Sequence, residues 1–210
     1  MSAPSRRAKE KQIREADIIS AAQKLFSQKG FENVSMDQIA SEAQFTKRTL
    51  YQYFSSKQDL YFAIVLQGFQ QLFAYCEEAV KKGGNGIEKL KLSFMAYYRF
   101  YRDFPETFHL MNYLGHVKKK SSPKQKEWIK FDDYMFQALA SIIELGKADG
   151  SLRKDLESVK TTHAMAFILT GFFHELSETG ATFSGHFNLD EEQFALFALE
   201  LLLESLKAKK

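Results

Sequence analysis

The chain has 210 residues, of which 45% are hydrophobic and 26% charged, as in ordinary globular proteins. Its single cysteine, Cys76, excludes an internal disulfide, and no uninterrupted apolar run approaches the ~18 residues of a membrane span. Because the N-terminus is charged and lacks the apolar core of a secretory signal, we expect a cytoplasmic protein with no membrane partner.

The net charge of +3 is unevenly distributed along the chain. Residues 1–60 carry ten Lys/Arg and seven Asp/Glu, whereas the remaining 150 residues carry nineteen of each sign. The positive excess therefore lies entirely in the N-terminal segment, where it suits contact with phosphates. The same excess also suits the solvated surface of a soluble protein, and charge alone does not separate the two interpretations.

Basic residues are concentrated at the start of the chain. Ahead of the first predicted helix we expect a basic arm, made of Arg6, Arg7, Lys9, Lys11 and Arg14. Such an arm can reach phosphates or an adjacent minor groove. A disordered, solubilising tail is an equally good interpretation of the same residues.

Helical patterns begin with residues 13–28. The apolar positions Ile18, Ala22, Leu25 and Phe26 have the spacing of an amphipathic helix, and Gly30 follows as a stop signal. This spacing predicts one helix that buries a single face.

Two shorter helices follow within the next 25 residues. Ser35 with Gln38 three residues later is a capping-box pattern, and Thr46 can cap a further helix over residues 47–53. Two short helices joined by a turn of about three residues must cross steeply, as in a helix-turn-helix. The small apolar core expected to fix this crossing consists of Ile39, Ala40, Leu50 and Phe54.

The rest of the chain predicts a larger helical body without strands. The expected helices cover residues 57–82, 87–102, 125–148, 155–180 and 191–210, with another from Pro105 and with Asn188 or Asp190 capping the last. Residues 118–124 and 181–188 are expected to be loops. The predicted fold class is all-α, with about nine helices in two domains: a helix-turn-helix domain over residues 1–56 and a helical bundle over residues 57–210.

Residues 18–65 carry a set of positions that identifies a family. The chain follows the pattern "AA..LF...G" and then a "T/S...IA..AGVS..TLY.HF..K..L" unit. The matching residues are Ala21, Ala22, Leu25, Phe26, Gly30, Ile39, Ala40, Ala43, Thr49, Leu50, Tyr51, Phe54, Lys57 and Leu60. This segment resembles the DNA-binding domain of the TetR family of transcriptional regulators, and residues 149–155 resemble a connection frequent in that family.

Two residues depart from the family pattern. Gln44 and Arg48 stand where the family commonly has glycine. Gln44 is expected to adopt a left-handed conformation, at a cost of about 1 kcal/mol. Arg48 adds a cation to the surface that the resemblance assigns to DNA.

The helix over residues 47–53 offers side chains that can read DNA. Arg48 can bind guanine O6 and N7 bidentately, Lys47 can reach a base or a phosphate, and Thr49 can contact a thymine methyl group or a phosphate. The resemblance places Tyr51 and Tyr53 beside the groove, and helix N-termini at Ser35 and Lys57 would bind phosphates. The full candidate set is Ser35, Thr46, Lys47, Arg48, Thr49, Tyr51, Gln52, Tyr53 and Lys57, although Gln52 equally suits solvent.

The resemblance also implies a homodimer formed by the last two long helices. A helix that is apolar all round must be buried on all sides, and both helices have such stretches. The expected interface residues are Phe167, Gly171, Phe172, Phe194, Phe197 and Leu201. A monomer with a thick core is the alternative.

The resemblance further implies a pocket for a small apolar or aromatic effector. The candidate lining residues are Tyr97, Tyr98, Tyr101, Phe108, Met111, Trp128, Phe131, Tyr134, Met135, His163 and Phe167. Each of these also suits the plain core of a helical domain.

The sequence therefore predicts a ligand-responsive repressor that binds a palindromic operator in double-stranded DNA as a homodimer. It shows no catalytic motif, no metal-ligand spacing and no cofactor fingerprint, so we expect neither an enzyme nor a cofactor. The alternatives are an all-helical small-molecule-binding protein or enzyme without specific DNA binding, and a non-specific DNA binder.

Overall fold

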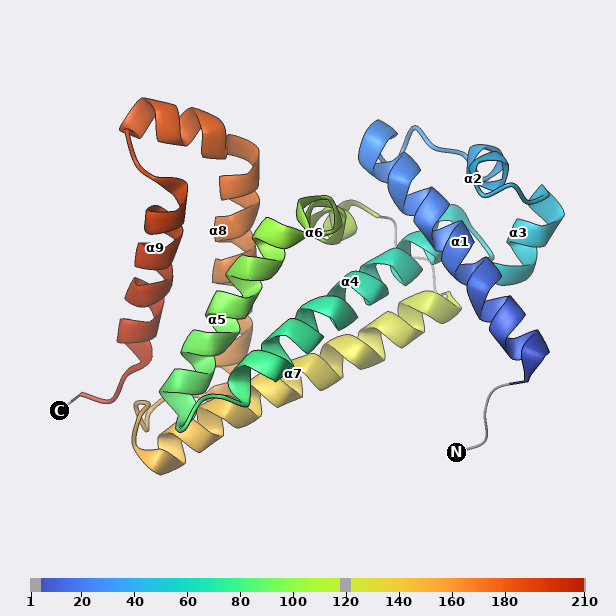
Figure 1. The fold of residues 1–210 in the computed structure, drawn as a ribbon. Coiled ribbons are helices and arrows are strands. Elements are labelled where there is room, and N and C mark those ends of the chain that lie inside the picture. The colour runs from blue at the N-terminus through green and yellow to red at the C-terminus, as the bar shows by residue number, and fades with distance from the viewer. Residues whose placement is uncertain (1–4, 118–121, 210) are drawn as a thin grey trace. The chain divides into compact units, whose positions relative to one another are not determined.

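The computed structural model describes residues 5–117 and 122–209 (Figure 1). These residues form nine α-helices and one 3-10 helix: α1 (Arg6–Lys29), α2 (Met36–Glu42), α3 (Lys47–Tyr53), α4 (Lys57–Val80), α5 (Gly86–Asp103), α6 (Pro105–Asn112), η1 (Tyr113–His116), α7 (Pro123–Asp149), α8 (Ser158–Phe187) and α9 (Glu191–Leu206). In the described part, strand-like pairing is limited to one isolated bridge between Leu152 and Lys207. The expected all-α class with a helix-turn-helix ahead of a helical body is confirmed.

The chain divides into two compact units. The first, called here the N-terminal unit, comprises Met1–Gly68 and Tyr113–Lys130. The second, called the body, comprises Phe69–Asn112 and Phe131–Lys210. Helices α4 and α7 contribute residues to both units. The functional boundary expected after residue 56 stays a prediction, because compactness does not test where a DNA-binding function ends.

The N-terminal unit buries the apolar residues that the helical spacing singled out. Ile18, Ala22, Leu25 and Phe26 on α1 are buried, as are Ile39 and Ala40 on α2 and Leu50 and Phe54 at α3. The rings of Phe26, Phe31, Tyr61 and Tyr113 add an aromatic cluster to this core. Full burial of a Leu or Phe side chain contributes about 1.5–3 kcal/mol, so this small core can hold α1, α2 and α3 together.

Two predicted helix boundaries are wrong by seven residues each. Helix α1 begins at Arg6 rather than at residue 13, so the basic residues belong to its first turns and not to a separate arm. Helix α8 continues through Phe187, so most of the loop expected over residues 181–188 is helical, and Figure 1 shows the helix changing direction in this last part. The end is Asn188 in the left-handed conformation, with φ 52°, which is a common helix stop. Of the loop expected over residues 118–124, residues 118–121 lie outside the described residues.

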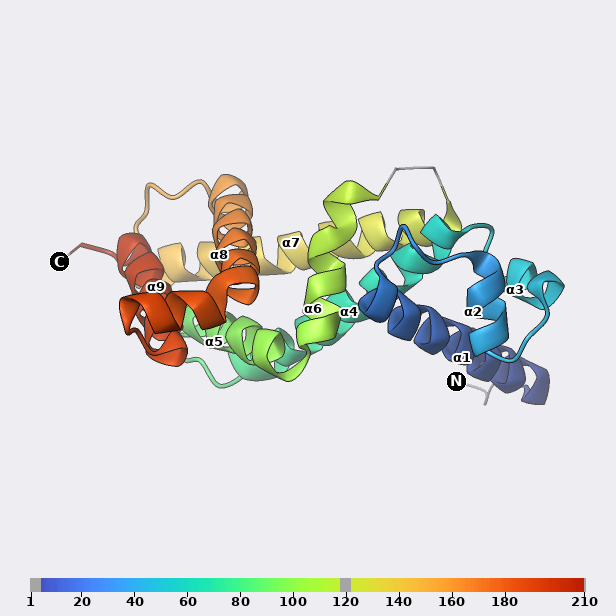
Figure 2. The ribbon, with the colours of Figure 1, turned by 90° about the horizontal axis from the view of Figure 1, so that it is seen from above.

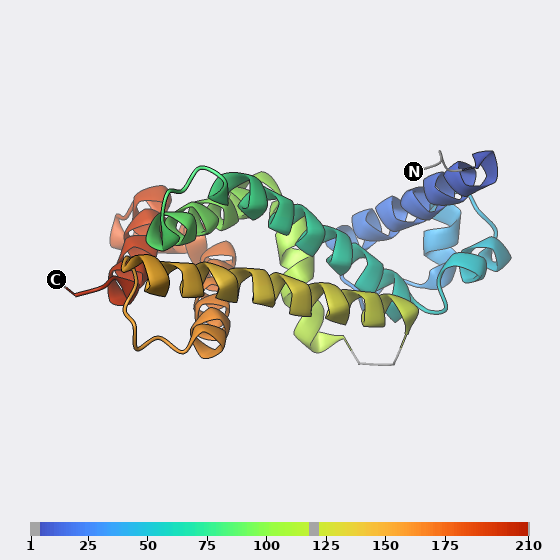
Figure 3. The same ribbon diagram turned by 90° about the horizontal axis from the view of Figure 1, so that it is seen from below.

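The body is organised around α5. Helices α6 and α9 pack against α5, and α6 also contacts α8 (Figure 2). On the other side of the body α4 and α7 run side by side, where the rings of Phe73 and Phe131 meet edge to face (Figure 3). The body core includes the fully buried Phe100 and Phe173. Its helices are therefore held by large aromatic side chains.

The start of α5 is fixed by the connection after α7. A Cβ on Gly86 would lie 2.1 Å from the Cα of Gly146, so the two backbones touch at this point. The Gly86 N–H donates to Asp149 at 2.7 Å, and the Ile87 N–H donates to the Ser151 hydroxyl at 3.1 Å. These bonds satisfy N–H groups that a helix start leaves free. The connection over residues 149–155 thus caps a neighbouring helix.

Candidate nucleic-acid interface

Local capping positions the two short helices. The Ser35 hydroxyl accepts from the Gln38 N–H at 3.2 Å, while the Gln38 side chain accepts from the Ser35 N–H at 2.8 Å. The Thr46 hydroxyl accepts from the Thr49 N–H at 3.1 Å. The capping box at Ser35 and the cap at Thr46 are confirmed. Both helices therefore begin where the sequence pattern places them.

The turn between α2 and α3 depends on one strained residue. Gln44 has φ 59°, which confirms the expected left-handed conformation at a position without glycine. The Phe45 N–H behind it donates to the Ala40 carbonyl at 2.9 Å. The turn is therefore closed by backbone bonds, at a cost of about 1–2 kcal/mol in the backbone of Gln44.

Helix α3 is anchored on one side and open on the other. Leu50 and Phe54 are completely buried, and they set the rotation of the helix about its axis. The opposite side exposes Lys47, Arg48, Tyr51 and Gln52, while Thr49 and Tyr53 are half-buried. The candidate residues of α3 thus form one cationic and aromatic face.

Lys47 has a partner within the unit. Its ammonium lies 2.8 Å from a carboxylate oxygen of Asp37 on α2, and the hydrogen bond to Asp37 raises the pKa of Lys47. Both side chains are largely exposed, so the pair contributes little to stability. Arg48 has no ion pair with the described residues. Arg48 is therefore the cation of α3 that is most available to a partner.

Lys57 is placed differently from the other candidates. Its ammonium donates to the Phe31 carbonyl at 2.7 Å and to the Glu32 carbonyl at 3.2 Å, and it lies 4.3 Å from the centre of the Phe31 ring. Burial lowers the pKa of this group. The Lys57 side chain thus stabilises the turn after α1 through these hydrogen bonds. Because its ammonium group is engaged there, only the backbone N–H groups at the start of α4 are available for the predicted phosphate contact.

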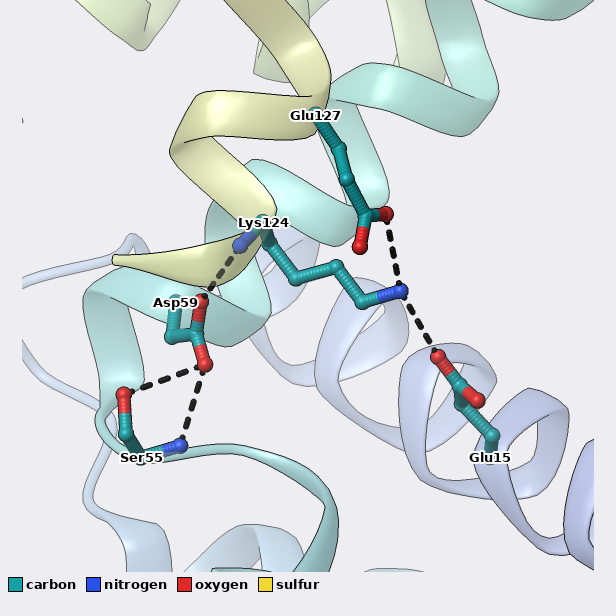
Figure 4. Close-up of polar contacts among 5 residues, drawn as sticks. All are labelled: Glu15, Ser55, Asp59, Lys124 and Glu127. Carbon is teal, nitrogen blue, oxygen red and sulfur yellow. Dashed lines mark hydrogen bonds and ion pairs between the residues drawn. The ribbon is translucent and has the colours of Figure 1, made fainter. Parts of the chain in front are cut away.

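Sequence reasoning missed a buried junction at the start of α4. The Asp59 carboxylate is 2% exposed and accepts from the N–H and the hydroxyl of Ser55, both at 3.1 Å (Figure 4). Its other oxygen accepts from the Lys124 N–H at 3.1 Å, and the Lys124 ammonium lies 3.0 Å from Glu15 on α1. The Asp59 carboxylate therefore accepts hydrogen bonds from residues at the starts of both α4 and α7. The pattern of Ser56 followed three residues later by Asp59 is a local signal that could have indicated it.

The predicted pocket residues do not form one group. Tyr97, Tyr98, Tyr101 and Phe108 gather around Phe173 in the body core, with ring centres 5.1–5.9 Å apart. Met111 is buried in the same core. These residues are the part of the prediction that the structure brings together.

Other predicted pocket residues lie elsewhere. Phe131 and Tyr134 pack on Phe73, and His163 stacks on Phe136 at 4.2 Å. Met135 is half-buried on α7. Trp128 packs on Phe62 in the N-terminal unit, and Phe167 is 79% exposed. Trp128 therefore does not belong to the body core, and Phe167 does not line a cavity within one chain.

The predicted interface residues divide in the same way. Phe167, Phe197 and Leu201 expose more than half of their surface, and the Gly171 backbone is open. Phe172 and Phe194 pack on each other and on the body core. An exposed apolar face therefore runs over α8 and α9. Phe172 and Phe194 are not part of this exposed face, because they pack on the body core beneath it.

The described residues include neither a membrane-spanning helix nor a cluster of metal ligands. None of their helices combines the length and the apolar character needed to cross a bilayer. No group of three or more His, Cys, Asp or Glu side chains among them is arranged to hold a metal ion.

Comparison with known proteins gives a consistent result. The sequence model described as "Bacterial regulatory proteins, tetR family" matches residues 18–64. The transcriptional activator FasR of Mycolicibacterium smegmatis is 28% identical over 98 residues, which are 47% of this chain and 45% of FasR. The transcriptional repressor KstR2 of the same organism is 22% identical over 154 residues, covering 69% of this chain and 70% of KstR2. The chain thus matches less than half of the length of FasR.

Solved structures extend the similarity to most of the chain at the level of the fold. A tetR-family regulatory protein from Rhodococcus RHA1 superposes with a TM-score of 0.72 and 20% identity, covering 94% of this chain and 98% of the other. The helix-turn-helix with its caps and anchors, the matching family model and the shared fold lead to one conclusion: residues 18–64 carry the sequence pattern of the TetR family, and the chain has the fold of the TetR-family regulatory proteins.

Proposed function

We propose that this protein is a transcriptional regulator that binds a specific operator in double-stranded DNA through α3. The observation that carries the proposal is the open face of α3, where Lys47, Arg48 and Tyr51 are exposed opposite two completely buried anchors. A short helix that is rigidly held and has cations in its first turn suits the major groove. Arg48 is the residue assigned to base reading, through bidentate hydrogen bonds to guanine.

The proposed regulator acts as a homodimer. One recognition helix contacts only a few base pairs, so specificity requires two copies reading two half-sites. Phe167, Phe197 and Leu201 support the face over α8 and α9 as the interface, because exposed apolar patches mark association sites.

The effector of the proposed regulator is a small apolar or aromatic molecule. Support comes from the aromatic body core, at whose edge the hydroxyl group of the partly buried Tyr97 lies 3.3 Å from that of the exposed Thr170. Such a combination suits a ligand that is mostly apolar and makes a few hydrogen bonds. We propose release of a repressor from DNA on effector binding, although one curated relative is named an activator and the other a repressor.

Footprinting of the DNA next to the gene tests this proposal and supplies the operator. The protein should then bind the identified duplex at least ~10³-fold more tightly than a scrambled duplex at ~0.15 M salt. Equal affinity for both duplexes would overturn the regulator and favour a non-specific DNA binder, and no binding at all would favour a small-molecule-binding protein.

The role of Arg48 has its own measurement within the same experiment. Arg48→Ala should reduce discrimination at one base pair by about 1–3 kcal/mol while binding to scrambled DNA changes little. Gln52→Ala, on the same exposed side of α3, serves as the control. A loss that is equal on operator and scrambled DNA would make Arg48 a phosphate contact instead.

A further inference from the structure

The first half of α1 extends beyond the core of its own unit. The helix begins at Arg6, where the Ser5 hydroxyl caps it by accepting from the Ala8 N–H at 3.3 Å. From Arg6 to Asp17 no residue is buried, and Ile18 is the first that is. About three turns of helix are therefore regular but carry no apolar packing.

The cations on this extension line up with the buried face of the helix. Arg7, Lys11 and Arg14 follow the i, i+4, i+7 spacing of one helix face. Ile18 and Leu25 lie eleven and eighteen residues after Arg7, which is about three and five helical turns. One face of α1 is thus apolar and buried from Ile18 onward, and the same face is cationic and exposed before Ile18. The cationic part, made of Arg7, Lys11 and Arg14, is called here the cationic stripe.

The position of this cationic stripe is set within the N-terminal unit. Figures 1, 2 and 3 each show α3 opposite the N-terminal half of α1 rather than its C-terminal half. The Lys124 ammonium holds Glu15, the residue after Arg14, at 3.0 Å (Figure 4). The extension of α1 therefore lies on the same side of the unit as α3. The ion pair between Lys124 and Glu15 holds α1 in place where the extension begins.

Within the described residues, the three cations of the stripe have no ion-pair partner. Arg6 pairs with Glu10 at 3.1 Å, but no carboxylate of the described residues pairs with Arg7, Lys11 or Arg14. Three exposed cations on one face exclude an apolar partner and fit a dense line of negative charge. Duplex DNA carries one charge per about 1.7 Å of its axis.

We propose that Arg7, Lys11 and Arg14 form a second DNA-binding surface that contacts phosphates beside the base pairs read by α3. The inference rests on the proposed function and adds to it a sequence-independent contact made by a preformed helix. Because the stripe is helical in the free protein, binding does not require the ordering of a disordered tail.

The chain offers a matched pair of variants for the test. Arg7→Gln with Lys11→Gln removes two charges from the stripe, whereas Arg6→Gln with Lys9→Gln removes the same two residue types from other faces of the same turns. Gln has a helix propensity similar to those of Arg and Lys, so both doubles should keep the helix, which circular dichroism checks.

The measurement is the dependence of DNA affinity on salt concentration, on the operator and on a scrambled duplex. Each lost phosphate contact should reduce the slope of log affinity against log salt by about 0.9, so the stripe double should lose about 1.8 per subunit on both duplexes. Its operator preference should stay within about twofold of wild type. The control double should keep the wild-type slope.

Duplex length provides a second readout. Shortening the operator from both ends should remove the difference between the stripe double and wild type before it removes operator preference. Equal slopes for the two doubles, or a stripe double that behaves as wild type, would overturn the inference while leaving the proposed function intact. If the wild-type protein shows no operator preference, the proposed function fails, and the salt slopes on the scrambled duplex still decide the role of the stripe.

Discussion

The N-terminal unit and the body expose different kinds of surface. In the described part of the N-terminal unit, the large apolar side chains left open lie on three different helices, namely Ile13 on α1, Tyr51 on α3 and Ile129 on α7, and the exposed face of α3 carries Lys47 and Arg48. In the body most of the open apolar side chains lie on α8 and α9, where Phe167, Phe197 and Leu201 are more than half exposed. The two units therefore suit different partners: a polyanion for the first and an apolar surface for the second.

The largest expected effect comes from comparing a buried phenylalanine of the N-terminal unit with an exposed phenylalanine of the body. Phe54→Ala should reduce the free energy of unfolding of the N-terminal unit by about 3–5 kcal/mol, because a fully buried ring leaves a cavity. Phe167→Ala should change the stability of the monomer by less than ~0.5 kcal/mol, because its ring is open to solvent. Urea unfolding at a protein concentration where the chain is monomeric measures both. Similar losses for the two variants would show that Phe167 is covered within one chain.

The second prediction tests whether the exposed face of the body is an interface. Phe197→Glu should weaken dimerisation at least ~30-fold, which corresponds to the ~2 kcal/mol of an interface hot spot. Leu145→Glu on α7 is the control, because that side chain is also exposed but lies outside the proposed interface. Sedimentation velocity over a concentration series measures the effect. A wild-type protein that stays monomeric, or equal weakening by both variants, would contradict the assignment to α8 and α9.

The third prediction compares two glycines of the body. Gly86→Ala should destabilise the body by roughly 1–3 kcal/mol, because its new Cβ would collide with the backbone of Gly146. Gly171→Ala meets no atom within 4 Å and should stabilise the monomer slightly, since alanine favours a helix. Thermal unfolding of both variants measures this. If Gly171→Ala instead weakens the dimer, two helices approach closely at that position of the proposed interface.

The sequence predicted those features that are determined by residues only a few positions apart in the chain. The caps at Ser35 and Thr46 and the left-handed Gln44 were predictable, because hydrogen bonds over three residues and a missing glycine determine them. The start of α1 was missed because an exposed helix carries no apolar period. The end of α8 was missed because its last turns contain residues typical of loops, including Gly185, which nevertheless lies within the helix.

The candidate site shows the same limit. The anchors Leu50 and Phe54 follow from spacing, but the contact of Lys57 with the turn after α1 joins residues 25 and 26 positions apart. Aromatic periodicity likewise did not separate Trp128, which belongs to the N-terminal unit, from Tyr101 in the body core. Contacts between distant segments require the fold, and short sequence patterns do not contain them.

The smallest expected effect compares Gln44 in the N-terminal unit with Asn188 in the body, the two non-glycine residues with a positive φ in the described part of the chain. Gln44→Gly should raise the free energy of unfolding by up to ~1 kcal/mol, because glycine removes the Cβ clash at φ 59°, although its greater freedom in the unfolded chain offsets part of this gain. Asn188→Gly, at φ 52°, should gain less, because asparagine already tolerates this conformation. Urea midpoints measured side by side give the difference. A larger gain at Asn188 would mean that the turn between α2 and α3 is relaxed despite Gln44. A gain in stability that leaves operator affinity unchanged would show that this strain has no part in presenting α3 to DNA.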